Sequence, residues 1–283
     1  MQVDTAENLD SIGAGTYHLT VTDFTGCTYT DSFVVQQSDT TAPTAVCQDA
    51  TLALDGSGSA TLTTGDIDNG SSDNCGTVIL SLSSTNFSCS DQGSTIVTLT
   101  ATDLAGNSSA CTATVTIEDN TPPVALCNDI TVSLYASGSV TVTTTDIDNG
   151  SSDNCEITLD SLDVGSFVCS DIGTHTYNYY VWDATGAADS CTGTITVEDN
   201  SAPAVNCPAD VTVTCTESTM PADVGMPTVV DNCSHTMQYC DNTAIADGVC
   251  TQSLTIERTW MVTDEGGNMG TCVHVISVVD TMP

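Results

Sequence analysis

The residues best suited to chemistry in this chain are aspartates, which recur beside Asn and Gly. The segment Asp66 to Cys75 reads DIDNGSSDNC, and it recurs unchanged from Asp146 to Cys155. The chain has 37 acidic residues and one basic residue, Arg258, giving a formal net charge of -36. Crowded carboxylates repel one another unless cations collect among them, and Ca²⁺ is the hard cation that prefers oxygen ligands. Structural calcium is therefore the predicted cofactor.

The charge also limits the partners. Contact with phosphate backbones or anionic lipid relies on Lys and Arg, so we expect no binding to nucleic acid. The chain has no run of 18 apolar residues and no signal-peptide pattern at its start, so we expect no membrane insertion in this segment and an export signal or anchor outside it. Fifteen cysteines indicate an oxidising compartment. An extracellular protein, secreted or attached to the cell surface, is predicted.

The elements that must position these aspartates form a repeat of 80 residues. Shifting the chain by 80 places the first repeat's cysteines on those of the second without a gap. Apolar residues alternate with Thr and Ser in short runs, as in Val97 to Ala101 and Thr112 to Ile117, and turn residues separate the runs. This pattern predicts an all-β fold, with tandem immunoglobulin-like antiparallel β-sandwiches arranged head to tail as a rod.

Four segments follow from the repeat. Residues 1–38 are expected to be the final hairpin of an incomplete domain, and Asp23 there matches the turn residue Asp103 of the next domain. Full domains are expected at 39–118 and 119–198. A diverged third copy is expected at 199–283, running into the start of a further repeat.

In such a sandwich the loop between the second and third strands and the last hairpin turn lie at one end, where the chain from the previous domain arrives. The acidic residues fall in those three places, so each domain junction is a predicted calcium site. The candidate ligands at the first junction are Asp39, Asp66, Asp68, Asp73 and Asp103; at the second Glu118, Asp119, Asn120, Asp146, Asp148, Asp153 and Asp183; and at the third Glu198, Asp199, Asp231 and Asp264.

The third junction lacks the long acidic loop and is expected to bind more weakly. The alternative is that these aspartates only cap turns, a role that Asp, Asn and Gly commonly fill. An EF-hand is rejected because the Asp66 loop lacks the glutamate at loop position 12 and flanking helices. Four scattered histidines make zinc improbable.

The cysteines are expected to be structural, because a small domain has a thin core and disulfides stabilise it through the unfolded state. Four cysteines allow three pairings, and neighbouring first and last strands favour Cys47 with Cys111 and Cys75 with Cys89. The second repeat would then pair Cys127 with Cys191 and Cys155 with Cys169. The pairs expected in the third repeat are Cys207 with Cys272, Cys215 with Cys233 and Cys240 with Cys250, and Cys27 would pair upstream.

No standard catalytic signature occurs, and paired carboxylates on a narrow sandwich lack the walled cleft that glycoside hydrolysis needs. The protein is therefore predicted not to be an enzyme. Tyr180 and Trp182 stand where the first repeat has Thr100 and Thr102 on the expected outer face. They are possible ligand contacts, because exposed aromatic rings stack on sugars or fill protein partners.

Three resemblances bear on function. Repeats that open with Asp-Thr-Thr-x-Pro and Cys, pass through Asp-Asn-Cys and end with Thr-Asp-x-x-Gly-Asn and Cys resemble HYR domains, over residues 39–283. The hairpin from Gly15 to Cys27 resembles the end of SprB-type repeats of Bacteroidetes gliding adhesins, and the linker Val197 to Pro203 resembles the calcium-binding linkers of cadherins. Ala187 departs from the pattern, which has Asn107 and Asn268 elsewhere. These resemblances imply immunoglobulin-like modules of large bacterial surface or fibre proteins.

The function that follows is a structural repeat region of a secreted or cell-surface fibre or adhesin, with calcium-stiffened junctions. Its expected partners are calcium ions and further copies of the repeat or chain. One alternative is a module that binds surface glycans or proteins through Tyr180 and Trp182. Another is a filament subunit whose incomplete first domain accepts a strand from a second chain.

Overall fold

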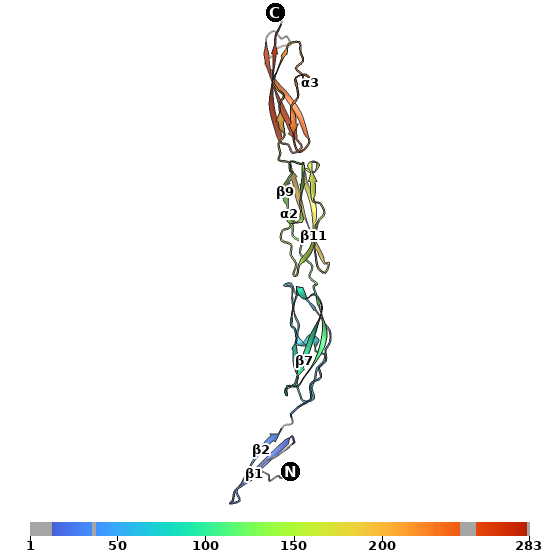
Figure 1. Cartoon of the computed structure of the whole chain (residues 1–283), viewed down its shortest axis with the longest axis vertical. Helices are drawn as coiled ribbons and strands as arrows, with labels where there is room; N and C mark the ends of the chain where they lie inside the picture. The colour runs from blue at the N-terminus through green and yellow to red at the C-terminus, as the bar shows by residue number, and fades with distance from the viewer. Residues whose placement is uncertain (1–12, 36–37, 244–252, 282–283) are drawn as a thin grey trace. The chain divides into compact units, whose positions relative to one another are not determined.

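The computed structural model describes residues 13–35, 38–243 and 253–281. By its contacts the chain divides into two compact units, Met1–Asn120 and Thr121–Pro283, and strands dominate both (Figure 1). Of the described residues, only short stretches of four are α-helical: α1 (Thr64–Ile67), α2 (Thr144–Ile147) and α3 (Pro221–Val224). None of the described helices is long and apolar enough to cross a membrane.

The first unit begins with a two-stranded hairpin, as the sequence predicted for this region. β1 (Gly15–Thr22) pairs with β2 (Thr28–Val35). The turn between them is held by Asp23, whose Oδ1 accepts hydrogen bonds from the backbone N–H groups of Thr25 and Cys27. In the described structure neither strand pairs with a third, and apolar side chains such as Leu19 and Val34 are exposed.

The rest of the first unit contains two sheets. Its elements are β3 (Ala50–Ala53), β4 (Ser59–Thr61), α1, β5 (Ile79–Leu82), β6 (Asn86–Ser88), the 3₁₀ turn η1 (Cys89–Asp91), β7 (Gly93–Thr102) and β8 (Ser108–Glu118). The larger sheet has the order β3-β8-β7-β5, and β4 pairs with β6 in the smaller one. The long hairpin β7-β8 is antiparallel, while β3 lies parallel to β8.

The second unit repeats this arrangement twice. The first set comprises β9 (Ile130–Ser133), β10 (Ser139–Thr141), α2, β11 (Ile157–Leu162), β12 (Ser166–Val168), η2 (Cys169–Asp171), β13 (Gly173–Asp183) and β14 (Ala188–Glu198). The second set comprises β15 (Ala204–Asn206), β16 (Val211–Thr214), α3, β17 (Thr228–Val230), β18 (His235–Thr243), β19 (Leu254–Asp264) and β20 (Met269–Val279). The large sheets have the orders β9-β14-β13-β11 and β16-β20-β19-β18. The predicted class, tandem all-β domains, is confirmed.

Alternation along the long hairpins builds each core. In β13 the side chains of Tyr177, Tyr179 and Val181 are buried while those between them are half-buried. Trp260 of β19 is likewise buried, at 2% exposed. Tyr177, Tyr179 and Trp260 are therefore core residues.

One cross-strand pair changes its chemistry from repeat to repeat. The pair is Val97 with Ala113 in the first repeat and Tyr177 with Gly193 in the second. In the third it is Arg258 with His274, both buried. Arg258 donates to both carboxylate oxygens of Asp241, at 2.7 and 2.8 Å. The single basic side chain of the protein is thus committed to an ion pair within a sheet.

Candidate functional site

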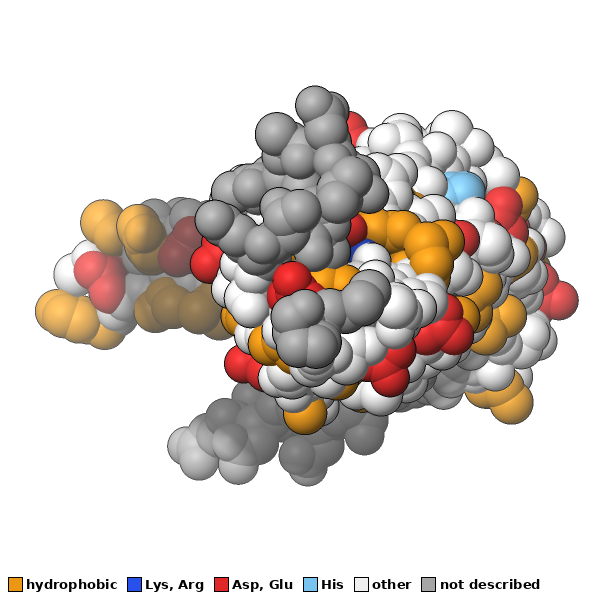
Figure 2. Space-filling model, turned by 90° about the horizontal axis from the view of Figure 1, so that it is seen from above, with side chains coloured by type: hydrophobic (Ala, Val, Ile, Leu, Met, Phe, Trp, Pro, Cys, Tyr) orange, Lys and Arg blue, Asp and Glu red, His pale blue; other side chains and the backbone are white. Residues whose placement is uncertain are grey.

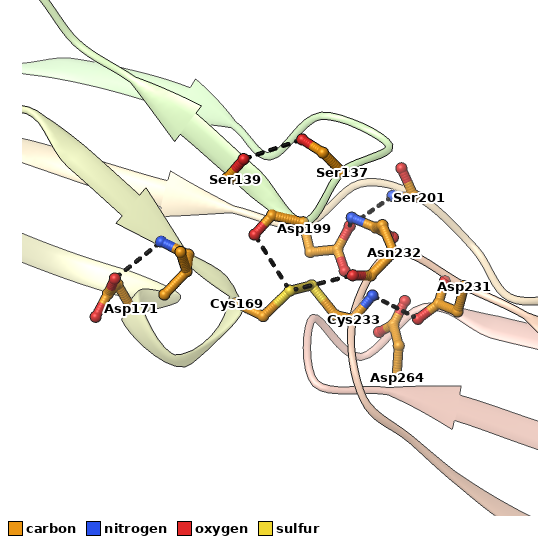
Figure 3. Close-up of a disulfide and its surroundings, with 12 residues drawn as sticks. Ser137, Ser139, Cys169, Asp171, Asp199, Ser201, Asp231, Asn232, Cys233 and Asp264 are labelled. Atoms are coloured by element: carbon orange, nitrogen blue, oxygen red, sulfur yellow. Dashed lines mark hydrogen bonds between the residues drawn. A yellow bond between two sulfur atoms is a disulfide. The ribbon is translucent and has the colours of Figure 1, made fainter.

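The clearest acidic cluster lies in the second unit, where the third repeat begins. Asp199, Asp231 and Asp264 each place a carboxylate oxygen within 4.8 Å of the others. They come from three separate segments: the linker after β14, the turn after β17 and the end of β19. Figure 3 shows the three side chains close together beside a disulfide. These are three of the four residues expected at the third junction.

The hairpin turn after β19 brings two of these carboxylates together. Both carboxylate oxygens of Asp264 accept hydrogen bonds from Asn268, one from its backbone N–H at 2.8 Å and one from its side-chain amide at 3.0 Å. The same amide donates to the backbone carbonyl of Asp199, at 2.8 Å. Gly266 permits this approach, because a Cβ there would lie 2.7 Å from that carbonyl oxygen.

The cluster is buried and lacks compensating charge. Asp199 is 4% exposed and Asp264 is 7% exposed. In the described structure the Oδ2 of Asp199 and the Oδ1 of Asp231 are buried oxygens without a hydrogen-bond partner, and so is the Oδ1 of Asn232. The other oxygens of Asp199 and Asp231 accept hydrogen bonds, but a buried carboxylate that keeps one unpartnered oxygen and lacks a counter-charge is destabilising. Since Arg258 is bound to Asp241, a cation from solvent fits these orphaned oxygens.

The neighbouring disulfide joins two successive repeats. Cys169, in the η2 turn of the second repeat, is bonded to Cys233 of the third, with Cα atoms 5.6 Å apart (Figure 3). Gly138 makes room for this contact, because a Cβ there would lie 2.5 Å from the carbonyl oxygen of Asn232 and 3.0 Å from the sulfur of Cys169.

Each residue of the Asp-Asn-Cys triplet contributes to this junction in its own way. Asp231 supplies a carboxylate to the acidic cluster. The side-chain amide of Asn232 donates to the Oδ1 of Asp199 at 3.1 Å and to the carbonyl of Tyr135, in the second repeat, at 3.4 Å. Cys233 supplies the covalent bond. Sequence analysis assigned the aspartate but missed the roles of Asn232 and Gly138.

This bond corrects two predicted pairings, Cys155 with Cys169 and Cys215 with Cys233. In the first unit Cys75 has a free thiol whereas Cys89 is disulfide-bonded, so the predicted pair of Cys75 with Cys89 is also wrong. The two cysteines lie at different places within the repeat: Cys75 lies with Asp39, while the sulfur of Cys89 lies 3.6 Å from the carbonyl oxygen of Gly58.

Of the other predicted disulfides, three form in the structure and one does not. The structure joins Cys47 to Cys111, Cys127 to Cys191 and Cys207 to Cys272, the pairs that neighbouring strands favoured. Cys240 is a free, exposed thiol and Cys250 lies outside the described residues, so the structure does not form the predicted pair between them. Cys27 is also a free thiol, and its expected upstream partner is not among the described residues.

A related cluster lies in the first unit. Asp39 and Asp73 group with the thiol of Cys75, and with Asp103 they line a cavity of about 340 Å³. Burial, followed by hydrogen bonding to Asp39, raises the pKa of the Cys75 thiol above its ordinary value. The thiol therefore stays protonated at neutral pH. Three of the five carboxylates expected at the first junction are thus brought together.

The other two carboxylates have local roles. The Oδ2 of Asp66 accepts hydrogen bonds from the hydroxyl and backbone N–H of Thr63, both at 2.7 Å, which closes a capping box at the start of α1. Asp68 accepts from the N–H of Ser71. Their pKa values are lowered, first by the hydroxyls of Thr63 and Ser71 respectively. The turn-capping alternative holds for these aspartates, which lie outside the acidic cluster.

The second repeat uses the equivalent residues in the same way. Asp146 caps α2 through Thr143, and Asp148 accepts from the N–H of Ser151. Glu198 also lies outside the acidic cluster of the third junction, because it is exposed and accepts from the amide of Asn200 at 3.3 Å.

The second predicted junction falls at the division between the two units, so it remains a prediction. Glu118, Asp119 and Asn120 end the first unit, while Asp153 and Asp183 lie in the second. Asp183 is 4% exposed, and its Oδ1 accepts hydrogen bonds from the N–H groups of Thr185 and Ala187. Its Oδ2 is a buried oxygen without a partner in the described structure.

The two aromatic residues of the second repeat lie side by side on one face of β13. The rings of Tyr180 and Trp182 stack with centroids 5.9 Å apart and an interplanar angle of 26°. Both side chains are half-buried. Both rings are therefore only partly exposed, although full exposure was expected. Together they form one surface.

Comparison with known proteins finds similarity in sequence over part of the chain. No family model matches the chain. Hyalin from Lytechinus variegatus is 35% identical over 150 residues, which cover 50% of this chain and 28% of that protein. The chain thus spans less than a third of this curated relative.

Solved structures of cadherin-type ectodomains also align. The protocadherin gammaB7 EC3-6 cis-dimer structure matches 93% of this chain and 82% of that chain, with 13% identity and a TM-score of 0.38. The mouse cadherin-23 EC22-24 structure matches 85% and 99%, with 12% identity and a TM-score of 0.31.

Proposed function

We propose that this chain is a structural repeat region of an extracellular adhesion-type protein, secreted or on a cell surface, whose repeat junctions are stiffened by Ca²⁺. The disulfides support an oxidising compartment. The stretch of 35% identity to hyalin supports its being part of a longer protein. The negative net charge of the chain supports partners that are cations. In Figure 2, red acidic side chains are widespread on the visible face and blue basic side chains are nearly absent.

The observation that carries the proposal is the buried, unpartnered Oδ2 of Asp199 among the carboxylates of Asp231 and Asp264. A protein folds around such a group only when something compensates its charge. The nearby Oδ1 of Asn232 is also without a partner. Three oxygens without a hydrogen-bond partner, on Asp199, Asp231 and Asn232, therefore lie in or beside this cluster.

The donor set selects the ion. Oxygen ligands suit hard cations, and Ca²⁺ accepts carboxylate, amide and backbone carbonyl oxygens in flexible geometry, whereas Mg²⁺ demands a near-ideal octahedron. The absence of His and Cys from this cluster disfavours Zn²⁺. Extracellular calcium modules bind with Kd values of about 10⁻⁴ to 10⁻³ M. We propose that Asp199, Asp231 and Asp264 hold Ca²⁺ and thereby fix the linker to the third repeat.

Thermal unfolding under non-reducing conditions tests this role. Calcium at about 100 times its Kd stabilises by about 2.7 kcal/mol, which raises the Tm of a domain of this size by roughly 10 to 20 °C relative to EDTA. The variant Asp199→Asn with Asp231→Asn should lose most of the shift for the third repeat. In EDTA it should be at least as stable as the wild type, because the repulsion is gone.

The matched control removes the same charge from exposed positions of the third repeat outside the cluster. Glu265→Gln with Asp223→Asn changes two exposed carboxylates of the third repeat and should keep the full calcium shift. Equal Tm values with calcium and with EDTA in the wild type would show that the junction needs no cation. The account would also fail if the control variant lost as much of the shift as the site variant.

The stacked rings of Tyr180 and Trp182 favour a second candidate function, contact with a sugar. A pair of rings on one strand face offers a broad apolar surface at low entropic cost. Replacing both by threonine, as in the first repeat, should abolish signals on a glycan array and leave the calcium response intact. Retained signals, or none in the wild type, would exclude this role.

A further inference from the structure

Three disulfides each close a loop that contains most of one repeat. They join Cys47 to Cys111, Cys127 to Cys191 and Cys207 to Cys272, and they close loops with sequence separations of 64, 64 and 65. A force applied to the ends cannot lengthen a closed loop beyond the span of its disulfide. Even if a repeat unfolds completely, the residues inside its disulfide-closed loop therefore do not bear the applied force.

Only two short stretches of backbone connect these loops. Each covers 16 peptide steps, from Cys111 to Cys127 and from Cys191 to Cys207. In the second unit, Cys191 to Glu198 already lies in β14 and Ala204 to Asn206 in β15. A strand rises about 3.3 Å per residue, close to the limit of a fully extended chain. Between the two cysteines, only residues 199–203 lie outside strands, so this stretch contains little slack.

The loaded strand is also well anchored. β14 pairs along one edge with β13 and along the other with β9. Ladder hydrogen bonds run across the strands, so a pull along β14 strains many of them together instead of opening them one after another. The equivalent strand β8 pairs with β7 and β3 in the first unit.

We infer that this chain acts as a tether that carries tension. The covalent path that bears the force is short and cannot be lengthened by unfolding of the repeats. The path runs through three disulfides and the ends of the last strands, and bypasses the loops that hold most of each repeat. This function rests on the proposed structural role in an oxidising compartment, and it is independent of the proposed cation. Calcium would stiffen the joint, while the disulfides limit its extension.

The disulfide between repeats has a different part in this scheme. A route through Cys169 and Cys233 runs 22 steps back from Cys191 and 26 steps back from Cys233 to Cys207. That route is longer than the direct 16 steps, so Cys169–Cys233 does not set the maximal length. It gives the folded junction a second covalent connection and restrains bending.

Single-molecule force spectroscopy of the whole chain, held by handles at both ends, tests the inference. At about 3.4 Å per step, the segment from Cys47 to Cys272 should extend to roughly 130 Å when oxidised and to roughly 760 Å when reduced. The contour gained on reduction is therefore about 640 Å. Segments outside this region contribute equally to both forms and cancel.

Two further arms make the result specific. Cys169→Ser with Cys233→Ser should add no contour length, because the shortest covalent path is unchanged. EDTA should leave the oxidised limit unchanged, so a failure of the calcium proposal would not imitate a failure of this one. An oxidised chain that extends as far as the reduced one would overturn the inference, and so would a gain of several hundred ångströms in the Cys169→Ser, Cys233→Ser variant.

Discussion

At the scale of single residues, the structure separates aspartates that share one sequence motif. Asp66 and Asp73 lie in the same segment, yet Asp66 closes a capping box with Thr63 while Asp73 joins the cluster with Asp39. The two aspartates differ in the group that lies nearest to the carboxylate. A hydroxyl three residues away satisfies Asp66, whereas Asp73 points toward the arriving linker. Asp73, Asp199 and Asp231 each accept a local backbone N–H on one carboxylate oxygen and keep the other oxygen without a partner in the described structure.

The capping aspartates predict a dependence of stability on pH. The Thr63 hydroxyl lowers the pKa of Asp66 below its ordinary 3.8, and Thr143 does the same for Asp146. A carboxyl whose folded pKa is depressed adds stability that is present above the unfolded value and lost as pH falls through the folded pKa. NMR titration should show Asp66 protonating below pH 3.8, and Thr63→Ala should move that midpoint upward. An unchanged midpoint in the variant would contradict the assigned cause.

Gly138 gives a second residue-scale prediction. Gly138 and Gly150 both have φ in the left-handed region, at 71° and 86°, but a Cβ on Gly150 would meet nothing within 4 Å. Alanine at either position costs about 1 to 2 kcal/mol of backbone strain. Only Gly138→Ala should also hinder the bond between Cys169 and Cys233, because its Cβ collides with Asn232.

Counting free thiols in the unreduced proteins checks this. Gly138→Ala should expose two more thiols in a measurable fraction of molecules, and Gly150→Ala should match the wild type. If both variants closed the disulfide equally well, the close approach at Gly138 would not matter for the junction.

At the scale of elements, the long hairpins of the three repeats solve one packing problem in three ways. The facing pair is Val97 with Ala113, then Tyr177 with Gly193, then Arg258 with His274. In the second repeat the large ring occupies the space that a Cβ on Gly193 would need, and its hydroxyl donates to the carbonyl of Asn128 at 2.6 Å. The large and small partners therefore belong together.

A double-mutant cycle tests this pairing. Gly193→Ala should destabilise by about 1 to 3 kcal/mol, because its Cβ would sit 2.6 Å from the Tyr177 oxygen. Tyr177→Val alone leaves a void. The two together recreate the pair of the first repeat, so urea unfolding should show a coupling of about 1 kcal/mol or more in favour of the double variant. Strictly additive effects would mean that the pair does not interact.

The sequence predicted the elements well and the connections between repeats poorly. Alternation and the 80-residue period were enough for the strands and for the disulfides Cys47–Cys111, Cys127–Cys191 and Cys207–Cys272, since the first and last strands neighbour each other. Cys169 was assigned a partner inside its own repeat. The sequence separation could have indicated the bond between Cys169 and Cys233, because its two cysteines are 64 residues apart, as Cys47 and Cys111 are. Asn232 carried no signal, because its amide bonds depend on how two repeats meet.

At the scale of the whole molecule, each kind of bond has its own part in the account. We propose that the disulfides within repeats limit extension, that the disulfide between repeats restrains the junction of the second unit, and that the acidic cluster binds calcium at that junction. Loss of the bond between repeats should therefore loosen the junction without unfolding either repeat.

Spin labels on the second and third repeats can measure this loosening. The distance distribution between them should be narrow in the oxidised wild type with calcium, and it should broaden in Cys169→Ser with Cys233→Ser. Tm values of the variant should stay close to those of the wild type. A distribution as narrow as that of the wild type would show that the noncovalent contacts of Asn232 suffice.

The most direct test of the central claim is calorimetric titration of the oxidised chain with Ca²⁺, beside the variant Asp199→Asn with Asp231→Asn. The account predicts that the wild type binds calcium with millimolar or tighter affinity and that the variant binds one ion fewer per chain. Identical stoichiometry in the two proteins, or no binding heat in the wild type, would contradict it.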